Sequence, residues 1–326
     1  MTILVTGGTG FIGSHVVEAL LKKDYTVRCL VRKTSNLQWL KPLGVDLVYG
    51  NFDDVDSLKD AVSGVDIIIH IAGVVAAKNR DGFFRGNVIA TRNLIAATLK
   101  YNPDLKKFLH VSSQTAVGPG LNGKPVDEST TPSPITTYGE SKLAAEKEVL
   151  SYKDTLPVTI VRPPAVYGPR DTATLSFFQS VQKGLVPLIG FTPKKVSLVH
   201  AYDLARGIVD AALSGITTGK IYFIASEDVY SWQEIGDVTS RVVGKRTLKL
   251  RIPEFLVMGI AGMSGFVSKF KKKPSVLNYE KGKDMIAENW TCSVEAAQRD
   301  FGYRQEMSLE DGIRNTLDWY REQGWL

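Results

Sequence analysis

Two hydrophobic periods alternate along the first half of the chain. Short apolar runs rich in β-branched residues are typical of buried strands, and longer stretches with apolar residues three or four positions apart are typical of helices with one buried face. The short runs predict strands at 3–5, 27–31, 46–49, 66–71, 107–111 and 158–161. The longer stretches predict helices at 11–23, 55–63, 84–101 and 138–152. Strands that alternate with helices indicate βαβ units and a mainly parallel sheet, which binds ligands at the carboxyl ends of its strands.

The pattern becomes looser after about residue 170. It still predicts helices at 174–183, 203–213, 232–243 and 309–323, and short strands at 197–199 and 221–224. The overall pattern favours an α/β fold, a doubly wound parallel sheet with a smaller α/β C-terminal domain for the substrate. We expect residues 1–170 to form the nucleotide-binding domain and residues 171–326 to form mainly the substrate domain. This second part is expected to be discontinuous, with a strand and a helix that return to the large sheet.

Composition places the chain among ordinary globular proteins. It has 326 residues, 44% hydrophobic and 23% charged, which excludes disordered, collagen-like and coiled-coil classes. Its two cysteines, Cys29 and Cys292, cannot form a disulfide framework and belong to no metal-ligand cluster, so a reducing compartment is expected. The N-terminus lacks the basic flank and long apolar run of a signal peptide, which favours a cytoplasmic location. The net charge of +6 is too weak to indicate a nucleic-acid partner.

A glycine-rich turn follows the first predicted strand. Residues 6–13 read Thr-Gly-Gly-Thr-Gly-Phe-Ile-Gly and open the helix predicted at 11–23. In this context one glycine allows the tight turn, one lets the backbone approach a pyrophosphate, and one lets the helix pack close to the strand. The free N–H groups and the dipole at the start of the helix attract phosphates. We therefore predict a Rossmann dinucleotide site rather than an ordinary glycine turn, with contacts from Gly7, Gly10, Phe11, Ile12 and Gly13.

The end of the second predicted strand bears on the choice of cofactor. Arg32 and Lys33 follow it directly. An acidic residue at this point binds the ribose 2′-hydroxyl of NAD, whereas an arginine suits the 2′-phosphate of NADP. Because no acid lies between Asp24 and Asp46, Arg32 favours NADP over NAD. The alternative is that Arg32 and Lys33 are solvated surface charges.

Two aspartates follow the third predicted strand. Asp53 and Asp54 lie in a loop that, in one interpretation, borders the adenine of the cofactor. In the other interpretation they cap the helix predicted to begin near Val55. The sequence leaves both open.

A tyrosine and a lysine lie four residues apart at the start of the helix predicted at 138–152. This spacing puts Tyr138 and Lys142 on one helix face. We expect the ammonium group to favour the phenolate and to lower the pKa of Tyr138 towards a working pH. Ser112 and Ser113 directly follow the strand predicted at 107–111. At the end of this strand a serine hydroxyl can hold a carbonyl or alkoxide beside the tyrosine.

These features together resemble the extended short-chain dehydrogenases/reductases, the NAD-dependent epimerase/dehydratase family, over nearly the whole chain. The matching motifs lie at residues 6–13, 70–73, 87–91, 112–113, 138–142 and 162–169. The resemblance implies that Tyr138 is the general acid/base, Lys142 its electrostatic partner and ribose ligand, and Ser113 the hydroxyl that orients the carbonyl. It further implies cofactor contacts or structural roles for Ala72, Gly73, Asn87, Ser112, Pro163 and Val166. His15 and His70 are expected to pack locally, and no metal site is expected.

The sequence departs from the sugar-modifying members of this family at two places. Those enzymes are typified by an arginine that grips the substrate diphosphate, and Val196 occupies its position here, with Lys194 and Lys195 as nearby substitutes. Dehydratases follow their catalytic hydroxyl residue with an acidic pair, and here Gln114 and Thr115 follow Ser113. The chain more closely resembles dihydroflavonol-4-reductase-like proteins, including the hopanoid-associated sugar epimerase-like group. The similar parts are residues 27–35, 162–169 and an apolar helix at 253–270.

We therefore expect an NAD(P)(H)-dependent oxidoreductase that reduces a ketone or oxidises a secondary alcohol on a small, lipophilic substrate. Two alternatives remain at this stage. One is a nucleotide-sugar 4-epimerase with tightly bound NAD, and the other is a regulator that senses the cofactor. Members of this family often dimerise through helices that match 84–101 and 138–152, so a homodimer is expected as well.

The basic charge of the chain is concentrated beside the apolar helix. Residues 269–283 contain six lysines against one glutamate, a local charge of +5. The uncharged stretch of the helix at 253–270 is too short to span a bilayer. It is a core helix, a lipophilic wall over the substrate, or a surface near 255–273 that contacts a membrane at its interface. The lysines are either a solvated face or the partner of an anionic surface.

Overall fold

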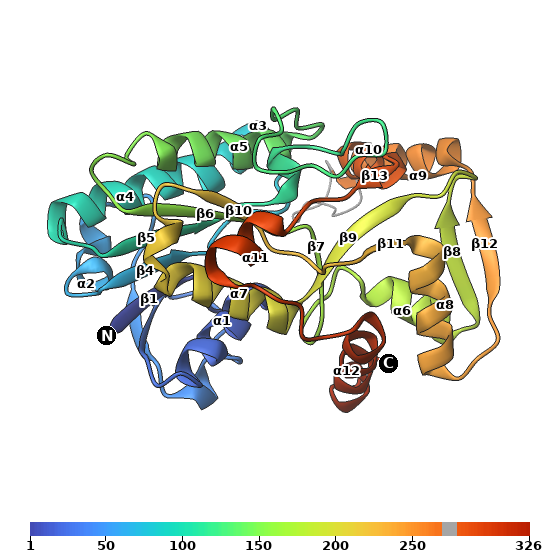
Figure 1. Cartoon of the computed structure of the whole chain (residues 1–326), viewed down its shortest axis with the longest axis horizontal. Coiled ribbons are helices and arrows are strands. Elements are labelled where there is room, and N and C mark those ends of the chain that lie inside the picture. The colour runs from blue at the N-terminus through green and yellow to red at the C-terminus, as the bar shows by residue number, and fades with distance from the viewer. Residues whose placement is uncertain (269–278) are drawn as a thin grey trace.

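The large part of the molecule is a parallel sheet. The structure is a computed structural model and describes residues 1–268 and 279–326, with the backbone alone for 265–268. Seven strands follow the order β10-β6-β5-β4-β1-β2-β3. Their bounds are β1 (Thr2–Thr6), β2 (Thr26–Val31), β3 (Asp46–Tyr49), β4 (Ile67–His70), β5 (Lys107–Val111), β6 (Val158–Arg162) and β10 (Ile221–Phe223). Figure 1 shows this sheet and its helices on the left and a smaller part on the right.

The strand order reverses between β1 and β4. Thr6, at the end of β1, pairs with Leu30 of β2 on one side and with His70 of β4 on the other. In doubly wound sheets the ligand crevice lies at this switch point, outside the carboxyl ends of the strands. The glycine-rich turn after β1 and the loop after β4 therefore meet at the predicted site.

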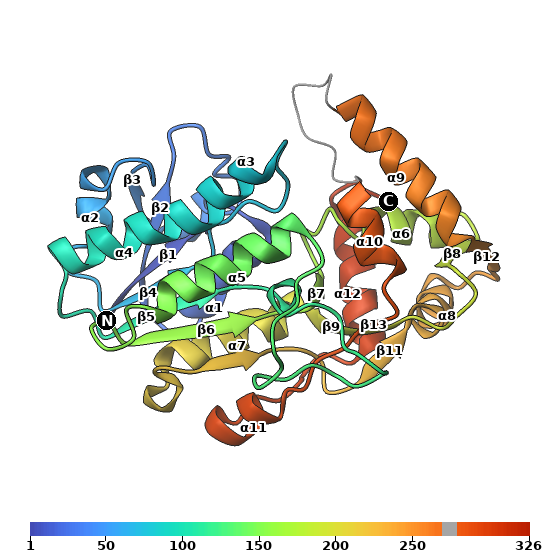
Figure 2. The same ribbon diagram turned by 90° about the horizontal axis from the view of Figure 1, so that it is seen from above.

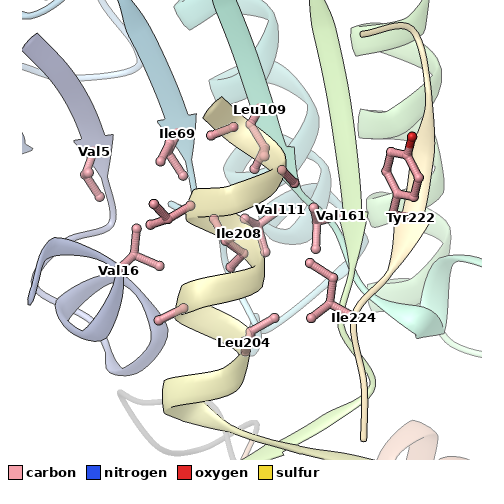
Figure 3. Packing of buried hydrophobic residues seen from close by; sticks show 14 of the residues in the cluster. Val5, Val16, Ile69, Leu109, Val111, Val161, Leu204, Ile208, Tyr222 and Ile224 are labelled. Atoms are coloured by element: carbon pink, nitrogen blue, oxygen red, sulfur yellow. The ribbon is translucent and has the colours of Figure 1, made fainter. Parts of the chain in front are cut away.

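Helices cover both faces of the sheet, as predicted. Leu94 of α4 (Ala90–Tyr101) and Val149 of α5 (Thr137–Leu150) pack with Phe108 of β5 on one face. α1 (Phe11–Leu21) and α7 (Ala201–Leu213) cover the other face through side chains that include Val16, Val17, Leu204 and Ile208. Figure 3 shows α7 lying across the strands, with Leu204 and Ile208 directed at Leu109, Val111 and Val161. The doubly wound fold is therefore confirmed. β10 joins the large sheet and α7 covers one of its faces, although both come from the second half of the chain.

The smaller part is built from short strands and helices. One sheet joins β7 (Ala165–Tyr167), β9 (Lys195–His200), β11 (Val229–Ser231) and β13 (Asn289–Trp290), and β8 (Leu185–Ile189) pairs with β12 (Leu248–Ile252). Its helices are α6 (Leu175–Gln182), α8 (Trp232–Val243), α9 (Glu254–Ser268), α10 (Tyr279–Ile286), α11 (Glu295–Phe301) and α12 (Leu309–Glu322). β7, β8, β11, β12, β13, α10 and α11 were not predicted, because most are shorter than the window over which a period can be recognised.

α9 and α10 form a helical pair at the edge of the smaller part. Gly282 of α10 faces Met258 and Ala261 of α9 so closely that a Cβ on it would lie 2.8 Å from the Met258 sulfur. Figure 2 shows α9 alongside α10 at the outside of the molecule. Of the helices in residues 1–268 and 279–326, none is long and apolar enough to cross a membrane.

Candidate functional site

The glycine-rich turn has the geometry of a dinucleotide cradle. Gly7 has a φ of +75°, and a Cβ on it would lie 2.7 Å from the backbone nitrogen of Ala72. A Cβ on Gly13 would lie 2.1 Å from the carbonyl oxygen of Gly7, so the helix can approach the turn only because residue 13 is glycine. Gly10 donates its N–H to Gly7 O at 2.9 Å and closes the turn.

The start of α1 has the features of an anion-binding site. Gly10 is the N-cap and supplies no capping side chain, and the first turn holds no acidic residue. The backbone N–H groups of Phe11, Ile12 and Gly13 therefore have no carbonyl partner within the helix. Because free N–H groups and the helix dipole attract phosphates, these residues fit the diphosphate of a dinucleotide.

Asn87 connects the loop after β4 to α5, the helix that carries Tyr138. It lies in a one-turn π-helix, Arg85–Ile89, which interrupts the single helix predicted at 84–101. Its amide accepts the Val74 N–H at 2.7 Å and donates to the Ser141 hydroxyl at 2.8 Å. A Cβ on Gly73 would lie 3.0 Å from the Asn87 side-chain oxygen. Asn87 thus fixes the loop at Ala72–Gly73 relative to α5.

Tyr138 lies in the first turn of α5. Thr136 caps this helix by accepting the Gly139 N–H at 3.1 Å, and Ser141 donates to the Tyr138 carbonyl at 2.7 Å. The tyrosine ring is partly buried, with its centroid 6.2 Å from that of Phe83. Burial raises the pKa of Tyr138 to about 12, a hydrogen bond with Ser113 lowers it, and the negative charge of Asp284 raises it.

Lys142 lies one turn behind Tyr138 and is buried. Its ammonium group donates to the Val111 carbonyl at 2.7 Å. Burial lowers the pKa of Lys142 to about 8, against the opposing effect of Glu146. The prediction that Lys142 lowers the pKa of Tyr138 is wrong for this structure, because the lysine is directed at a main-chain carbonyl and burial of the phenol dominates.

The two serines after β5 have different surroundings. The Ser113 hydroxyl accepts hydrogen bonds from the N–H and hydroxyl of Thr115, at 3.2 and 2.9 Å, and interacts with Tyr138. The Ser112 hydroxyl is buried and has no hydrogen-bond partner among the residues that the structure describes. The placement of Ser113 beside Tyr138 fits the role that the resemblance implies for it.

Pro163 and Val166 lie behind the serines. The Pro163 carbonyl accepts the Gln114 N–H at 2.8 Å, which holds the turn after β5 against the end of β6. Val166, on β7, pairs with Val199 of β9 and is partly buried in the core below the site. The Pro163 carbonyl thus borders the serine side of the site, whereas a cofactor contact of Val166 stays a prediction.

Two carboxylates of α10, those of Glu280 and Asp284, lie close to α5, the helix that carries Tyr138. Their proximity to α5 was not predicted from the sequence. Glu280 accepts the Thr137 hydroxyl at 2.6 Å and the Thr137 N–H at 3.2 Å, at the start of α5. Asp284, one turn further, is close enough to raise the pKa of Tyr138, and its Oδ1 is buried without a hydrogen-bond partner within residues 1–268 and 279–326. Burial raises the pKa of Asp284 itself, while Lys281, 3.5 Å away, opposes this shift. The spacing of Glu280 and Asp284 predicts that they share a helix face. No pattern in the neighbouring sequence indicates that this face lies against Tyr138.

The predicted adenosine-side residues lie at the ends of β2 and β3. Arg32 is exposed just beyond β2, where its N–H donates to the Ser35 hydroxyl at 3.0 Å. Asp53 forms a bidentate ion pair with Arg85 at 2.9 and 3.0 Å. Asp54, not Asp53, accepts the N–H groups that open the next helical turn, including that of Asp56 at 3.1 Å. The capping role therefore belongs to Asp54, and a contact of Asp53 with adenine stays a prediction.

The positions that grip a diphosphate in sugar-modifying relatives are not available for that purpose. Val196 is buried in the apolar core of the smaller part. Lys194 is buried, pairs with Glu254 at 2.8 Å and donates to the Ile286 carbonyl. Lys195 alone remains exposed. A nucleotide-sugar diphosphate would therefore find one lysine where an arginine is expected.

His15 and His70 have local partners, as expected. His70 lies between the hydroxyls of Thr6 and Thr91, at 2.7 and 3.0 Å, and burial lowers its pKa to about 3. His15 contacts the Pro169 carbonyl at 2.8 Å. Within the described ranges, no group of three or more metal-ligating side chains comes together.

Comparison with known proteins agrees with this geometry. A family model described as the NAD dependent epimerase/dehydratase family matches residues 3–225. The ceramide reductase of Caulobacter vibrioides is 30% identical over 99% of this chain and 96% of its own length. The 3β-hydroxysteroid dehydrogenase/Δ5→4-isomerase of Mycobacterium tuberculosis is 28% identical over 98% and 90%. The dTDP-glucose 4,6-dehydratase of Streptomyces venezuelae, solved with NAD, is 26% identical over 100% and 98%, with a TM-score of 0.79.

Proposed function

Because the chain belongs to the NAD dependent epimerase/dehydratase family, we propose that it interconverts a ketone and a secondary alcohol on an apolar substrate. The observation that carries the proposal is the meeting of Ser113, Tyr138 and Lys142 beside the glycine-rich turn at the switch point of the sheet. A reduced nicotinamide cofactor, held at the glycine-rich turn by residues such as Gly10 and Gly13, would supply the hydride for this reaction. The protein supplies the proton and the orientation.

In reduction, the Ser113 hydroxyl holds the carbonyl oxygen and Tyr138 gives its phenolic proton to that oxygen. The products are the secondary alcohol, the oxidised cofactor and a tyrosinate, which regains its proton from solvent. A pKa of about 12 keeps Tyr138 protonated at neutral pH, which suits a proton donor. Oxidation runs in the opposite sense and requires the tyrosinate first. The resting state of the site therefore favours reduction.

The β4 side of the site favours an apolar substrate. Residues 74–77 read Val-Val-Ala-Ala, and Asn87 holds the first of them against the catalytic helix. Val75 is 77% exposed, so this loop presents an apolar side chain to solvent. Phe83 adds an aromatic ring beside Tyr138. Relatives that are a ceramide reductase and a 3β-hydroxysteroid dehydrogenase support the same substrate class.

The buried positions of Val196 and Lys194 favour an oxidoreductase over a nucleotide-sugar 4-epimerase. An epimerase must hold a diphosphate firmly while its sugar rotates between two hydride-transfer poses. Lys194 is already neutralised by Glu254, so its charge is committed within the fold. Intact Tyr138 and Lys142 further favour an enzyme over a regulator that senses the cofactor.

The proposal includes a preference for NADP(H). Arg32 and Lys33 are exposed at the end of β2, and Arg32 has no ion-pair partner among the described residues. A free guanidinium group binds a 2′-phosphate through charge-assisted hydrogen bonds. Ser35, which accepts the Arg32 N–H, adds a hydroxyl to the same turn.

The test is consumption of reduced nicotinamide by the purified chain. Oxidation of NADPH and NADH is followed with a 3-ketosteroid and a long-chain aliphatic ketone, and conversion of UDP-glucose to UDP-galactose is followed without added cofactor. We expect NADPH consumption with an apolar ketone, lost in Tyr138→Phe. Epimerisation of the nucleotide sugar without net consumption, or equal rates in Tyr138→Phe, would overturn the proposal.

A further inference from the structure

The outer face of α9 is an apolar surface exposed to solvent. Phe255 is 73% exposed, Met263 66%, Ile260 50% and Leu256 46%. At 3.6 residues per turn these four side chains occupy about 140° of the helix circumference. Gly259 lies on the same side, and a Cβ on it would meet no atom of the described residues within 4 Å. We call these four side chains the α9 face.

The opposite side of α9 is anchored to the protein. Val257 and Ala261 are buried, and Met258 and Ala261 lie against Gly282 of α10. Glu254, at the first turn, forms the ion pair with buried Lys194. The interpretation of this helix as an ordinary core helix is therefore wrong for its outer face, since the helix is held on one side and leaves four large apolar side chains in water.

We propose that the α9 face binds the surface of an anionic lipid membrane. A helix fixed on one side with an apolar outer face fits the geometry of a segment that lies in the membrane interface, with its side chains at the boundary of headgroups and acyl chains. At 15 residues, α9 is too short to span the bilayer. Contiguous apolar surface of this kind marks an interaction site rather than ordinary scattered exposure.

The surrounding charge determines which partner fits. In the sequence, α9 is followed by Lys269, Lys271, Lys272 and Lys273, which lie outside the described residues. Within the described part, Lys281 is half-exposed on α10, and Lys283 lies 5.3 Å from the centre of the exposed Tyr279 ring. Lysines beside an apolar face and an exposed tyrosine match an anionic lipid surface, since basic residues near such a surface are attracted to its headgroups and tyrosines favour the interface. A second copy of this chain would bring equal charges together instead.

The position of the face relative to the site has a consequence for the substrate. α9 packs on α10, and α10 contacts the start of α5 through Glu280 and approaches Tyr138 through Asp284. A membrane bound at the α9 face would thus lie one helix away from the catalytic tyrosine. An apolar substrate dissolved in that membrane would have a short route to the site.

The test is sedimentation of the full chain with lipid vesicles. Vesicles of phosphatidylcholine alone are compared with equimolar phosphatidylcholine and phosphatidylglycerol, at low and high salt. We expect binding to the anionic vesicles, weakened by salt, and an affinity about tenfold or more lower in Phe255→Ser/Met263→Ser. The matched control is Tyr49→Ser/Ile216→Ser, which removes two side chains of similar exposure, 51% and 54%, from the large sheet domain.

Each outcome decides the proposal independently of catalysis. Equal binding by both double variants, or no binding to the anionic vesicles, would overturn it. A change from dimer to monomer in Phe255→Ser/Met263→Ser, measured by light scattering without lipid, would assign the face to a second copy of the chain. Retained turnover of a water-soluble ketone by the α9 variant would show that the site itself is intact.

Discussion

Glu280 accepts the hydroxyl hydrogen bond of Thr137 at 2.6 Å, across 143 positions of the chain. The contact places a carboxylate at the N-terminus of α5, where the helix dipole favours negative charge. It also fixes α10, and with it Asp284, against the helix that carries Tyr138. Tyr138 therefore lies on a helix that is held in place by a contact from a distant part of the sequence.

Glu280→Ala should weaken the start of α5. It removes an acceptor for the Thr137 hydroxyl and N–H together with a negative charge, so the free energy of unfolding should fall by about 1 kcal/mol. Because α10 positions Asp284, kcat should fall more than the affinity for the cofactor, whose cradle lies on α1. Chemical denaturation and steady-state kinetics measure the two effects.

The control for this variant is Glu140→Ala. Glu140 also lies in the first turn of α5, but it is partly exposed and pairs with the exposed Arg80 at 3.1 Å. Exposed ion pairs contribute little, so its loss should change both quantities only slightly. Equal effects of the two substitutions would show that α10 does not position the site.

Asp284→Asn should move the pH profile of alcohol oxidation. Ionised Asp284 raises the pKa of Tyr138, and an amide of the same shape removes that charge. The pKa of Tyr138 should therefore fall, and the tyrosinate that oxidation requires should form at lower pH. The rising limb of kcat/KM against pH should shift downwards.

Asp318→Asn is the matched control, since Asp318 is exposed on α12 and pairs with Arg321. Its profile should coincide with that of the unmodified chain. An upward shift in Asp284→Asn, or none, would contradict the electrostatic role of Asp284.

The cofactor cradle could be predicted from the sequence because it is local. Gly7, Gly10 and Gly13 lie within one turn between a strand and a helix, and their spacing alone defines how close the backbone comes. The same holds for Tyr138 and Lys142, whose shared face follows from the helix period. Spacings this short are fixed by the local backbone geometry, so the packing of the rest of the chain does not alter them.

Asp284 and the protonation of the site could not be predicted in this way. The effect of Lys142 on Tyr138 depends on where its ammonium points and how deeply both groups are buried, and these depend on β5 and α10.

One strand of the smaller part did carry a sequence signal, because Leu248 and Leu250 of β12 alternate with Lys249 and Arg251. There the leucines are exposed, so the usual inference of a buried face would have been misleading.

Ser113→Ala and Ser112→Ala should differ sharply. Ser113 contacts Tyr138 and Thr115, and loss of a hydroxyl that stabilises developing charge typically lowers kcat about a hundredfold. The buried Ser112 hydroxyl has no hydrogen-bond partner in the described part of the chain, so its removal relieves a desolvation penalty and should leave turnover nearly unchanged. The opposite pattern in steady-state kinetics would mean that Ser112 is the residue that orients the carbonyl.

Arg32→Ala should change the cofactor preference. Loss of a charge-assisted contact to the 2′-phosphate should weaken NADP binding about tenfold or more and leave NAD binding nearly unchanged. Isothermal titration with both cofactors measures the ratio. Lys41→Ala removes another exposed cation and should leave the ratio intact. Tighter binding of NAD than of NADP by the unmodified chain would contradict the proposed role of Arg32.

Lys142 should make stability increase with pH above about 8. Below that pH the folded and unfolded chains both hold the proton, and the folded chain carries the full cost of burying an ammonium group. Above it the folded chain releases the proton, whereas the unfolded chain retains it up to a pKa of about 10.4. The unfolded state then binds more protons, so the free energy of unfolding rises with pH through this window.

The measurement is the difference in unfolding free energy between the unmodified chain and Lys142→Met, at several pH values from 7 to 10. This difference should move in favour of the unmodified chain as pH rises, because only that chain is relieved of a buried charge. Other titrating groups are common to both proteins and cancel. Lys41→Met, which removes an exposed lysine, should show no such trend. A flat or opposite slope for Lys142→Met would mean that Lys142 keeps an ordinary pKa in the folded chain.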